Sequence, residues 1–278
     1  MKVVKHSGIV VDFDASKLRK SLLKSGANQD VVDAIMQHIG NVVYDGIPTK
    51  QIYKIAFGLL KKESNSFAAQ YNLRDAILLL GPAGFYFEKF IARIFESEGF
   101  STQTNLTLNG KCVSHEIDVV LKKDNQISMV ECKFHGSNEV RTDVKVPMYI
   151  LSRFNDLKDK NHIIYSKKDQ ISNCWIVTNS RFTSDAITFA RCSNLNLLSW
   201  DYPKNNNLRT KIDQKGLYPT TCLTTLTRSE KDRLLTLNCV LVIDLIKNPE
   251  SLEQIGLSSN RMKNVIKEAT SLCNYFKS

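Results

Sequence analysis

The segment from Glu116 to Lys133 constrains this chain more than any other. It reads EIDVVLKKDNQISMVECK, in which two short apolar runs flank the polar stretch KKDNQ. Apolar runs bounded by turn-forming residues predict a β-hairpin. Because residues two apart on a strand share a face, Glu131 and Lys133 should point the same way, and the hairpin should bring Asp118 opposite Glu131. The sequence therefore predicts two carboxylates and one ammonium group in one place.

This set of side chains suits phosphate chemistry. Two carboxylates can hold Mg²⁺, which prefers oxygen ligands and keeps several waters. Such an ion polarises a phosphoryl oxygen and acidifies a bound water. Lys133 could orient the attacking water and offset the charge that develops on the phosphate. The alternative is an ordinary amphipathic hairpin whose charges face water, because a motif this short also recurs by chance.

Composition places the chain among folded cytoplasmic proteins. Its 278 residues allow two or three domains, and 42% apolar and 24% charged residues are typical of globular chains. We expect no membrane association, because no apolar run reaches spanning length and the N-terminus MKVVKHSG has no signal peptide. The 7 cysteines are scattered, with none two or three residues apart, which predicts reduced thiols and no zinc site.

The net charge of +10 is concentrated at the two ends of the chain. Residues 1–82 carry 11 Lys and Arg against 7 Asp and Glu, a net +4, and residues 204–278 carry 12 against 7, a net +5. The middle, 83–203, has 15 against 14, a net +1. Basic ends suit an anionic partner such as a nucleotide or nucleic acid, although a generally basic soluble protein would look the same.

Residues 1–82 predict a small hairpin followed by helices. Apolar residues at 3–4 and 9–11 flank a turn, and Asp14 is a good N-cap for a helix from residue 15 to before Gly26. A second helix should cover about 30–40, and a third should begin at Thr49 as its cap. A fourth, over 67–80, should end at the stop signal Gly81-Pro82, a domain boundary.

The stretches VVKHSGIVVDFDASKLRKSL, YDGIPTKQIY and AAQYNLRDAI resemble the ATP-cone, the nucleotide-binding regulatory module of ribonucleotide reductases and their repressors. The resemblance covers nearly all of residues 1–82. It implies ATP or dATP as a regulatory ligand, with Lys5 and Lys17 at the phosphates and a hydroxyl contact from Thr49. His6 and Ser7 stand where the family usually has Arg and Asp, and His6 joins the candidate binding residues. Solvated lysines on a helical scaffold are the alternative.

The middle of the chain alternates helices and strands. FYFEKFIARIFESEGF is an amphipathic helix, STQTNLTL alternates as a strand, and VPMYILSRFNDL is helix-like. An apolar run at 175–177 predicts a buried strand, Thr183 or Ser184 should cap a helix, and residues 195–198 should form the next strand. Strand, helix and strand at this spacing form a crossover unit, so we expect an α/β domain with a mixed sheet.

Four stretches in order, FEKFIARIFESEGF, EIDVV, VECKFH and IVTNSRFTSDAITFA, resemble the Mrr-like branch of the PD-(D/E)XK restriction endonuclease fold. The resemblance covers about residues 85–200. It implies catalysis by Asp118, Glu131 and Lys133, with Mg²⁺ on the two carboxylates and Glu88 as an auxiliary acidic residue. Two histidines, His115 and His135, are alternative bases, although a surface or hydrogen-bonded role suits each. The side chain of Cys132 should point to the opposite, buried face.

The C-terminal part starts with DYPKNNNLRTKIDQKG, which is polar and Asn-rich and predicts a linker. Helical segments follow, and the turn IGL before the last, basic helix weakly resembles a helix-hairpin-helix element. Such a turn can present backbone N–H groups to a DNA phosphate. A helical cap or a dimerisation module fits the same residues.

Together these features predict a multi-domain α/β protein. It has an ATP-cone at 1–82, a nuclease domain at 83–203, and a linker with a small helical domain at 204–278. The expected activity is Mg²⁺-dependent endonucleolytic hydrolysis of DNA, with double-stranded DNA as partner and ATP or dATP as regulator. One site per chain favours a homo-oligomer for cutting both strands. The alternatives are a catalytically silent DNA-binding protein and a nucleotide-sensing regulator; the intact carboxylate and lysine set favours the enzyme.

Overall fold

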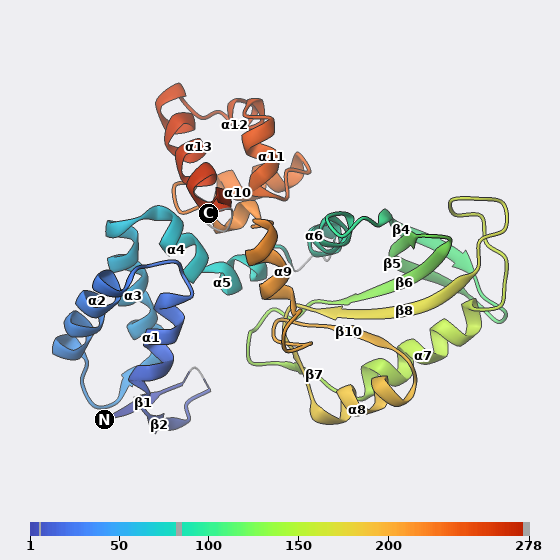
Figure 1. Cartoon of the computed structure of the whole chain (residues 1–278), viewed down its shortest axis with the longest axis horizontal. Coiled ribbons are helices and arrows are strands. Elements are labelled where there is room, and N and C mark those ends of the chain that lie inside the picture. Colours follow the sequence, from blue (N-terminus) through green and yellow to red (C-terminus); the bar gives the residue numbers. More distant parts are fainter. Residues whose placement is uncertain (6, 82–84, 275–278) are drawn as a thin grey trace. The chain divides into compact units, whose positions relative to one another are not determined.

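The computed structural model describes residues 1–5, 7–81 and 85–274 (Figure 1). They form two compact units, one of residues 1–76 with 220–278 and one of residues 77–219. The predicted multi-domain α/β class is confirmed, with a mostly helical N-terminus, a mixed central sheet and a helical C-terminal region. Among the described residues, no helix has the length and apolar character needed to cross a membrane.

A small sheet opens the first unit. Its described strands are β1 (Lys2–Val4), β2 (Val10–Asp12) and β3 (Ile47–Pro48), in the order β2-β1-β3. The β1–β2 pair is antiparallel, as the predicted hairpin requires, and β3 adds to β1 in parallel. The sequence did not reveal β3, because two residues are too few to show a strand period.

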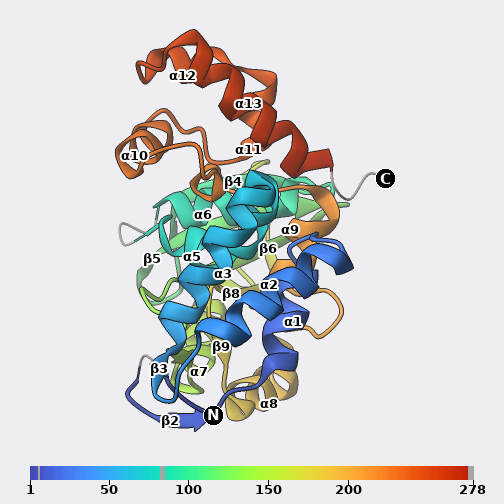
Figure 2. The same ribbon diagram turned by 90° about the vertical axis from the view of Figure 1, so that its left-hand side faces the viewer.

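Three helices pack beside this sheet: α1 (Ala15–Leu23), α2 (Gln29–Val42) and α3 (Thr49–Glu63) (Figure 2). Asp14 caps α1 as predicted, by accepting from the backbone N–H groups of Ser16 and Lys17. The prediction that Thr49 caps α3 is wrong. Thr49 is the first helical residue and Pro48 is the N-cap, because Ile47 and Pro48 are held extended by pairing with β1.

The predicted helix over 67–80 is divided in two, α4 (Asn65–Tyr71) and α5 (Leu73–Leu78). The break falls at Asn72, whose side-chain Oδ1 accepts a hydrogen bond from the Tyr53 hydroxyl at 2.7 Å. Asn competes well with helical backbone bonding, and its tertiary partner is invisible in a local pattern. Of the predicted boundary at Gly81-Pro82, Pro82 lies outside the described residues.

The C-terminal part of this unit contains a 3₁₀ turn and four short to medium helices in the described range. They are η1 (Thr220–Cys222), α10 (Arg228–Thr236), α11 (Val242–Lys247), α12 (Glu250–Gln254) and α13 (Ser259–Asn274). Thr227 and Glu230 form a capping box at the start of α10. Gly256 has φ +82° and makes the turn between α12 and α13, where the IGL turn was predicted.

Hydrogen bonds join the two sequence-distant parts of this unit. Thr221 Oγ1 donates to the carbonyl of Ala76 at 2.7 Å, and Lys61 Nζ donates to the carbonyl of Thr224 at 3.0 Å. The carboxylate of Glu268 is 3% exposed and accepts from the backbone N–H groups of Thr224 and Thr225 at 2.7 and 2.9 Å. The buried acid on α13 thus holds the loop that leads into α10.

The second unit is built on a mixed sheet with the order β10-β8-β6-β5-β4. Antiparallel pairing joins β4 to β5 and β5 to β6, while β6, β8 and β10 run parallel. The predicted hairpin and crossover unit are therefore both present. The strands are β4 (Ser101–Asn109), β5 (Ser114–Lys123), β6 (Gln126–Lys133), β8 (Ile171–Thr178) and β10 (Asn196–Leu198).

Helices cover both faces of this sheet. Figure 1 shows α6 (Phe85–Glu96) on one face and α7 (Lys145–Leu157) and α8 (Ser184–Cys192) on the other. The apolar stripe of α6 is fully buried, and Phe95 packs edge-on against Trp175 of β8 at a ring distance of 5.4 Å. Thr183, one of the two predicted caps, is the N-cap of α8.

Three short elements in this unit were not predicted. Strands β7 (Arg141–Thr142) and β9 (Arg181–Phe182) form a separate parallel pair. The expected linker contains a helix, α9 (Leu208–Lys215), with Asn207 as N-cap and Gly216 in the left-handed conformation at its end. Its composition is polar, but Leu208 and Ile212 are fully buried and Lys211 forms an ion pair with Glu98, so tertiary contacts stabilise it.

Candidate active site and nucleotide pocket

The hairpin of β5 and β6 creates the predicted cluster. Val119 pairs with Val130, which places Asp118 and Glu131 next to each other at the following position. The turn residues Asp124 and Asn125 both have positive φ, as a tight hairpin turn demands. Lys133 Nζ donates to Glu131 Oε1 at 2.9 Å. The structure therefore brings all three residues of the motif together.

Asp118 lies directly against the backbone that carries the other two. Its Oδ2 accepts the N–H of Cys132, the residue between Glu131 and Lys133, at 2.6 Å. Burial, and after it the carboxylate of Glu131, raises the pKa of Asp118 to about 6. A buried acid that faces a second acid favours its neutral form until a cation arrives.

Glu88, on the first turn of α6, joins this acidic group. Its Oε2 is buried and has no hydrogen-bond partner within residues 1–5, 7–81 and 85–274. Burial raises its pKa to about 7, with further contributions from Asp118, Glu116 and Glu131. Buried oxygens without partners are costly, so an unpaired one beside other carboxylates indicates a place for a cation or water.

Two participants were missed by the sequence reasoning. Arg153 of α7 donates through Nη1 to Glu131 Oε2 and through Nη2 to the carbonyl oxygen of Glu116. The side chains of Arg153 and Glu131 are 11% and 6% exposed. Glu116 contributes its charge to the cluster. The sequence does not single out Arg153, because no spacing connects a residue of α7 to the hairpin.

The other candidate residues make structural contacts. His115 Nε2 lies 2.7 Å from Asp156 Oδ2, and Asp156 also accepts from the backbone of Cys112, so this pair ties the β4–β5 loop to α7. His135 Nε2 lies 2.9 Å from Thr142 Oγ1, and burial followed by the charge of Lys133 lowers the pKa of His135. Burial raises the pKa of the Cys132 thiol well above its ordinary value. Hydrogen-bonded roles, foreseen for both histidines, are what the geometry provides.

The carboxylates fit a hard divalent cation. Among the described residues no preformed group of three or more His, Cys, Asp or Glu is arranged as a metal site. Even so, Glu88 Oε2 is buried and unpaired, and one oxygen of Asp118 remains beyond its bond to Cys132. Oxygen donors whose charged forms repel one another are what Mg²⁺ takes in proteins. Both oxygens of Glu131, by contrast, are already held by Lys133 and Arg153.

A separate cavity of about 260 Å³ lies in the N-terminal part of the first unit. Lys5, Lys17 and Thr49, three of the four predicted nucleotide-binding residues, line it; the fourth, His6, lies outside the described residues. Lys17 is exposed and pairs with Asp14 at 3.2 Å. The lysines therefore share one opening with the first residue of α3.

Aromatic side chains that the sequence reasoning did not single out form part of this wall. Tyr53 and Tyr71 line the cavity and stack with ring centroids 4.9 Å apart and planes 15° apart. Tyr53 is also bonded to Asn72 at the α4–α5 break. The opening thus has lysine ammonium groups and flat aromatic rings, the two features that phosphate and nucleobase recognition require.

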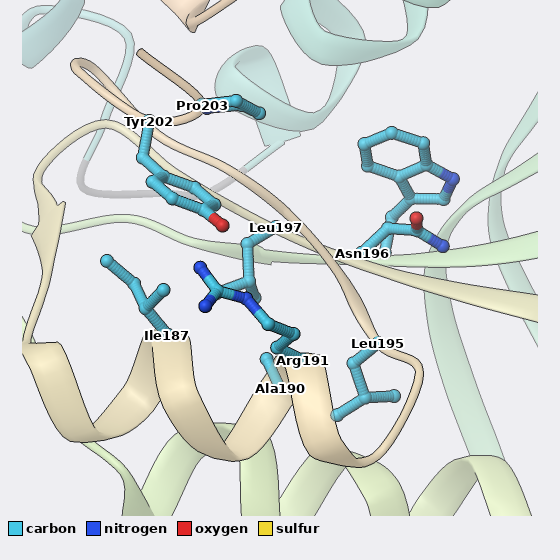
Figure 3. Close-up of a pocket in the computed structure, with 9 residues that line it drawn as sticks. Ile187, Ala190, Arg191, Leu195, Asn196, Leu197, Tyr202 and Pro203 are labelled. Carbon is cyan, nitrogen blue, oxygen red and sulfur yellow. The ribbon is translucent and has the colours of Figure 1, made fainter.

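Another pocket, of about 210 Å³, lies beside β10 and α8 (Figure 3). Figure 3 shows Tyr202 above Ile187 with its hydroxyl directed toward Arg191, and Leu197 behind them. None of the predicted site residues lines this pocket. It is separate from the carboxylate cluster of β5 and β6.

Comparisons with known proteins match three family models along the chain. Family models match for an ATP cone domain at residues 1–75, a restriction endonuclease domain at 82–202 and an AF1548-like C-terminal domain at 218–273. An uncharacterized protein of Archaeoglobus fulgidus is 36% identical over 180 residues, which are 64% of this chain and 97% of that protein. The crystal structure of AF1548, a protein of unknown function, is 34% identical with a TM-score of 0.56, covering 69% of this chain and 98% of that one.

The ATP-cone and Mrr-like resemblances predicted from the sequence are thereby confirmed. The match to the Archaeoglobus protein extends over nearly all of that relative. The order of the matched domains, from ATP cone through restriction endonuclease to C-terminal module, follows the elements described above. The chain belongs to the family of this Archaeoglobus fulgidus protein, with a restriction endonuclease-like domain and an AF1548-like C-terminal domain that follow an ATP-cone.

Proposed function

We propose that this protein is a Mg²⁺-dependent endodeoxyribonuclease that hydrolyses phosphodiester bonds and is controlled by ATP or dATP. The observation that carries the proposal is the convergence of Asp118, Glu131 and Lys133, with the unpaired buried Oε2 of Glu88 beside them. Acids with raised pKa values, here Asp118 and Glu88, are frequent at functional sites. The restriction endonuclease match supports DNA as the class of substrate.

Asp118, Glu88 and Glu131 are the residues that would hold the metal ion. When bound, Mg²⁺ supplies a polarised phosphoryl oxygen and a more acidic water. Glu88 and Asp118 would lose their protons when the ion binds, because their pKa values are raised by burial and by neighbouring carboxylates, chiefly Asp118 for Glu88 and Glu131 for Asp118. In this proposal, Asp118 and Glu88 are the first carboxylates to meet the ion, since Glu131 is held by two cationic side chains.

The cationic residues would act on the substrate's phosphate. Lys133 lies 2.9 Å from Glu131 Oε1, and its side chain is 34% exposed, so its ammonium group can reach a nucleotide while remaining oriented. A fixed positive charge at this place offsets the negative charge that develops during phosphodiester hydrolysis. Arg153 orients Glu131 from the opposite side and is the positioning residue of the cluster.

The nucleotide would bind in the cavity of the N-terminal part, with its phosphates near Lys5, Lys17 and Thr49. His6, which follows Lys5 in the sequence, is proposed as a further contact. The cavity holds about 260 Å³ of space and its wall includes the stacked pair Tyr53 and Tyr71. The acids among the described residues that line it are Asp12 and Asp14, which are paired with Lys2 and Lys17 and do not form a cluster comparable to that of β5 and β6. ATP or dATP is therefore proposed as a ligand and not as a fuel.

DNA contact by the C-terminal module is a further part of the proposal. The turn at Gly256 precedes α13, which exposes Lys263 and Lys267 four residues apart. A turn that offers backbone N–H groups, followed by a basic helix face, suits a DNA phosphate. Cutting of both strands of a duplex by one site per chain would need two copies, so we also propose a homo-oligomer.

One observation favours a second candidate, a catalytically silent DNA-binding or nucleotide-sensing protein. Both oxygens of Glu131 are occupied, by Lys133 and Arg153. If these bonds persist in the presence of Mg²⁺, Glu131 cannot serve as a ligand and the site would lack one carboxylate. The free oxygens of Glu88 and Asp118 favour the enzyme.

Cleavage of DNA tests the proposal directly. The full chain would be incubated with supercoiled and linear duplexes, with gapped duplexes and with single strands, in Mg²⁺ or EDTA, and with or without ATP or dATP. Linearised or fragmented DNA that appears only with Mg²⁺ is the expected result. Absence of cleavage of every DNA form at millimolar Mg²⁺, with DNA binding retained, would favour the silent alternative.

A further inference from the structure

Building on the proposed nuclease function, we propose that Tyr149 is a stacking platform for an unpaired nucleobase beside the scissile phosphate. The substrate would then be DNA with single-stranded or unstacked nucleotides at the point of cleavage. A fully paired duplex would be a poorer ligand for this site. The inference rests on where Tyr149 lies, what lies beneath its ring, and which charges surround it.

Tyr149 is one of several large apolar side chains that α7 and the preceding segment leave in solvent. It is 59% exposed, Met148 beside it is 50% exposed, and Val140 is 46% exposed. The opposite side of the same helix is buried, with Pro147, Ile150 and Leu157 in the core. Single exposed apolar residues are common, whereas adjacent ones next to a functional site indicate contact with a partner.

The ring is connected to the carboxylate cluster through one side chain. The guanidinium of Arg153, one turn further along α7, lies 5.7 Å from the ring centroid of Tyr149. The same guanidinium donates to Glu131 Oε2 and to the carbonyl oxygen of Glu116. Because both ends of its fork are engaged, Arg153 forms a fixed base under the ring. A base stacked on Tyr149 would therefore be separated from Glu131 by the side chain of Arg153 alone.

Charge around the ring suits a polynucleotide. On the solvent side of α7, Lys145, Met148, Tyr149 and Ser152 follow one another at helical spacing, and all are exposed. The helix has one acidic residue, Asp156, which is engaged by His115 at 2.7 Å. The acid within α7 is thus paired, and the cations Lys145 and Arg153, at the start of the helix and beneath the ring, favour contact with phosphate.

The chemistry of stacking selects for unpaired bases. In a duplex each base face is covered by its neighbours, so a protein aromatic ring has no face to stack on unless the step is opened. In single-stranded or gapped DNA the faces are free, and aromatic stacking adds to phosphate contacts for any base. A ring held by Arg153 would stack on any base. The site would therefore distinguish unpaired from paired strands and would not distinguish one base from another.

Binding measurements on the full chain test the proposal. In EDTA and an Asp118→Asn background, fluorescence anisotropy would compare a labelled gapped duplex with the same duplex fully paired. Removing the ring in Tyr149→Ala or Tyr149→Leu should weaken binding to the gapped DNA about five- to a hundredfold. Tyr149→Phe, which keeps the ring, should bind it like the parent. Affinity for the fully paired duplex should change by less than about twofold, because phosphate contacts dominate there.

Control variants distinguish the loss of ring stacking from a nonspecific effect of removing an exposed side chain. Tyr44 is 53% exposed in the other unit and does not belong to α7, so Tyr44→Ala should leave the gapped-to-paired preference unchanged. Thermal unfolding of every variant should match the parent, since Tyr149 is largely in solvent. Tyr149→Leu keeps apolar area without a flat ring, and so distinguishes stacking from hydrophobic contact.

Two results would overturn the inference: equal loss of affinity for both DNAs, or no loss on the gapped DNA with Tyr149→Leu. Neither result concerns the proposed nuclease function, which is decided by Mg²⁺-dependent cleavage by the parent protein. Conversely, a preference for gapped DNA that depends on the ring, without any DNA cleavage, would support the stacking role of Tyr149 and exclude the proposed nuclease function. The two proposals can therefore fail separately.

Discussion

Arg153 donates from Nη1 to Oε2 of Glu131, the carboxylate that also accepts from Lys133 at 2.9 Å through Oε1. One acid in the cluster is therefore neutralised from both sides, while Asp118 and Glu88 are not. The consequence is a division of labour among the three carboxylates. Glu131 is fixed in place before any ligand arrives, and the pair with raised pKa values provides the unpaired oxygens.

Asp118→Asn should abolish DNA cleavage while the protein remains folded. The amide keeps the shape of the side chain and can still accept the N–H of Cys132, but it removes a charged ligand. Loss of such a ligand typically costs on the order of 10³-fold or more in rate. Single-turnover cleavage with Mg²⁺ measures the effect, and circular dichroism checks the fold.

Asp124→Asn is the matched control for this substitution. Asp124 lies exposed in the turn of the same hairpin with φ 51°, a conformation that Asn adopts readily. The Asp124→Asn variant should cleave DNA at the same rate as the parent. Cleavage by Asp118→Asn at close to the parental rate would remove the cluster as the catalytic site.

Glu88→Gln should stabilise the metal-free protein at high pH and not at low pH. Burial and neighbouring acids raise the pKa of Glu88 from its ordinary 4.5 to about 7. Between these two pH values the folded protein keeps Glu88 protonated while the unfolded chain does not. The stabilisation of the folded state by protonated Glu88 is therefore fully present below about pH 4.5 and is lost as the pH rises through about 7. The neutral amide avoids that loss.

In EDTA at pH 8, the unfolding temperature of Glu88→Gln should exceed that of the parent by on the order of 2–4 °C. At pH 4 the two temperatures should agree, because Glu88 is then protonated in both states. Glu139→Gln, at an exposed position of the same unit, should show no such dependence on pH. A stability difference that is constant across pH would mean that Glu88 is not held in a carboxylate cluster.

The central hairpin and the positions of its motif residues were predictable because they depend on local patterns. Alternation and a polar turn located β5 and β6, and the two-residue period placed Glu131 and Lys133 on one face. The caps at Asp14 and Thr183 were likewise local and correct. Each of these features is determined by residues within one element or one turn.

The features that were missed depend on contacts between distant residues. Arg153 reaches Glu131 across 22 positions, and no spacing rule connects a helix residue to a strand that precedes it. The break at Asn72 depends on a hydrogen bond from the hydroxyl of Tyr53. Helix α9 is polar in composition and depends on the burial of Leu208 and Ile212. Helix propensity determines the secondary structure at such positions only where tertiary contacts do not override it.

Lys5→Ala should weaken ATP or dATP binding by roughly tenfold to a hundredfold, the effect of losing one charge-assisted contact to phosphate. Isothermal titration calorimetry on the full chain measures it. Lys20→Ala is the control, since Lys20 is exposed on α1 but does not line the cavity. Absence of binding heat in the parent at millimolar nucleotide would rule out the cavity as a nucleotide site.

Replacing Lys263 and Lys267 together by Ala should reduce the salt dependence of DNA binding. If both contact phosphates, the slope of log affinity against log salt should decrease by about 1.8, because each neutralised phosphate contributes about 0.9. Anisotropy titrations from low to moderate salt give the slope. Lys54→Ala, an exposed lysine on α3, tests whether any loss of positive charge has the same effect. An unchanged slope in the double variant would exclude α13 as a DNA contact.

Glu268→Ala should destabilise the unit formed by the N-terminal and C-terminal parts. The carboxylate is 3% exposed and accepts from the N–H groups of Thr224 and Thr225 and from the Thr225 hydroxyl at 2.6 Å. Removing the acceptor leaves buried donors without partners, which costs about 1–3 kcal/mol for each group left unpaired. Glu268→Gln keeps one acceptor oxygen and should lose less. Glu253→Ala, exposed on the neighbouring helix α12, should be neutral.

Hydrogen exchange distinguishes this local effect from a general loss of stability. The amides of Thr224 and Thr225 should exchange faster in Glu268→Ala, and so should that of Ala68 in α4, because α13 packs on α4 and Ser271 is bonded to Ser66 at 3.3 Å. The strands β5 and β6 belong to the other unit and should keep their parental protection. Faster exchange in β5 and β6 to the same degree would mean that the two units unfold together and that Glu268 does not act through the α13–α4 contact.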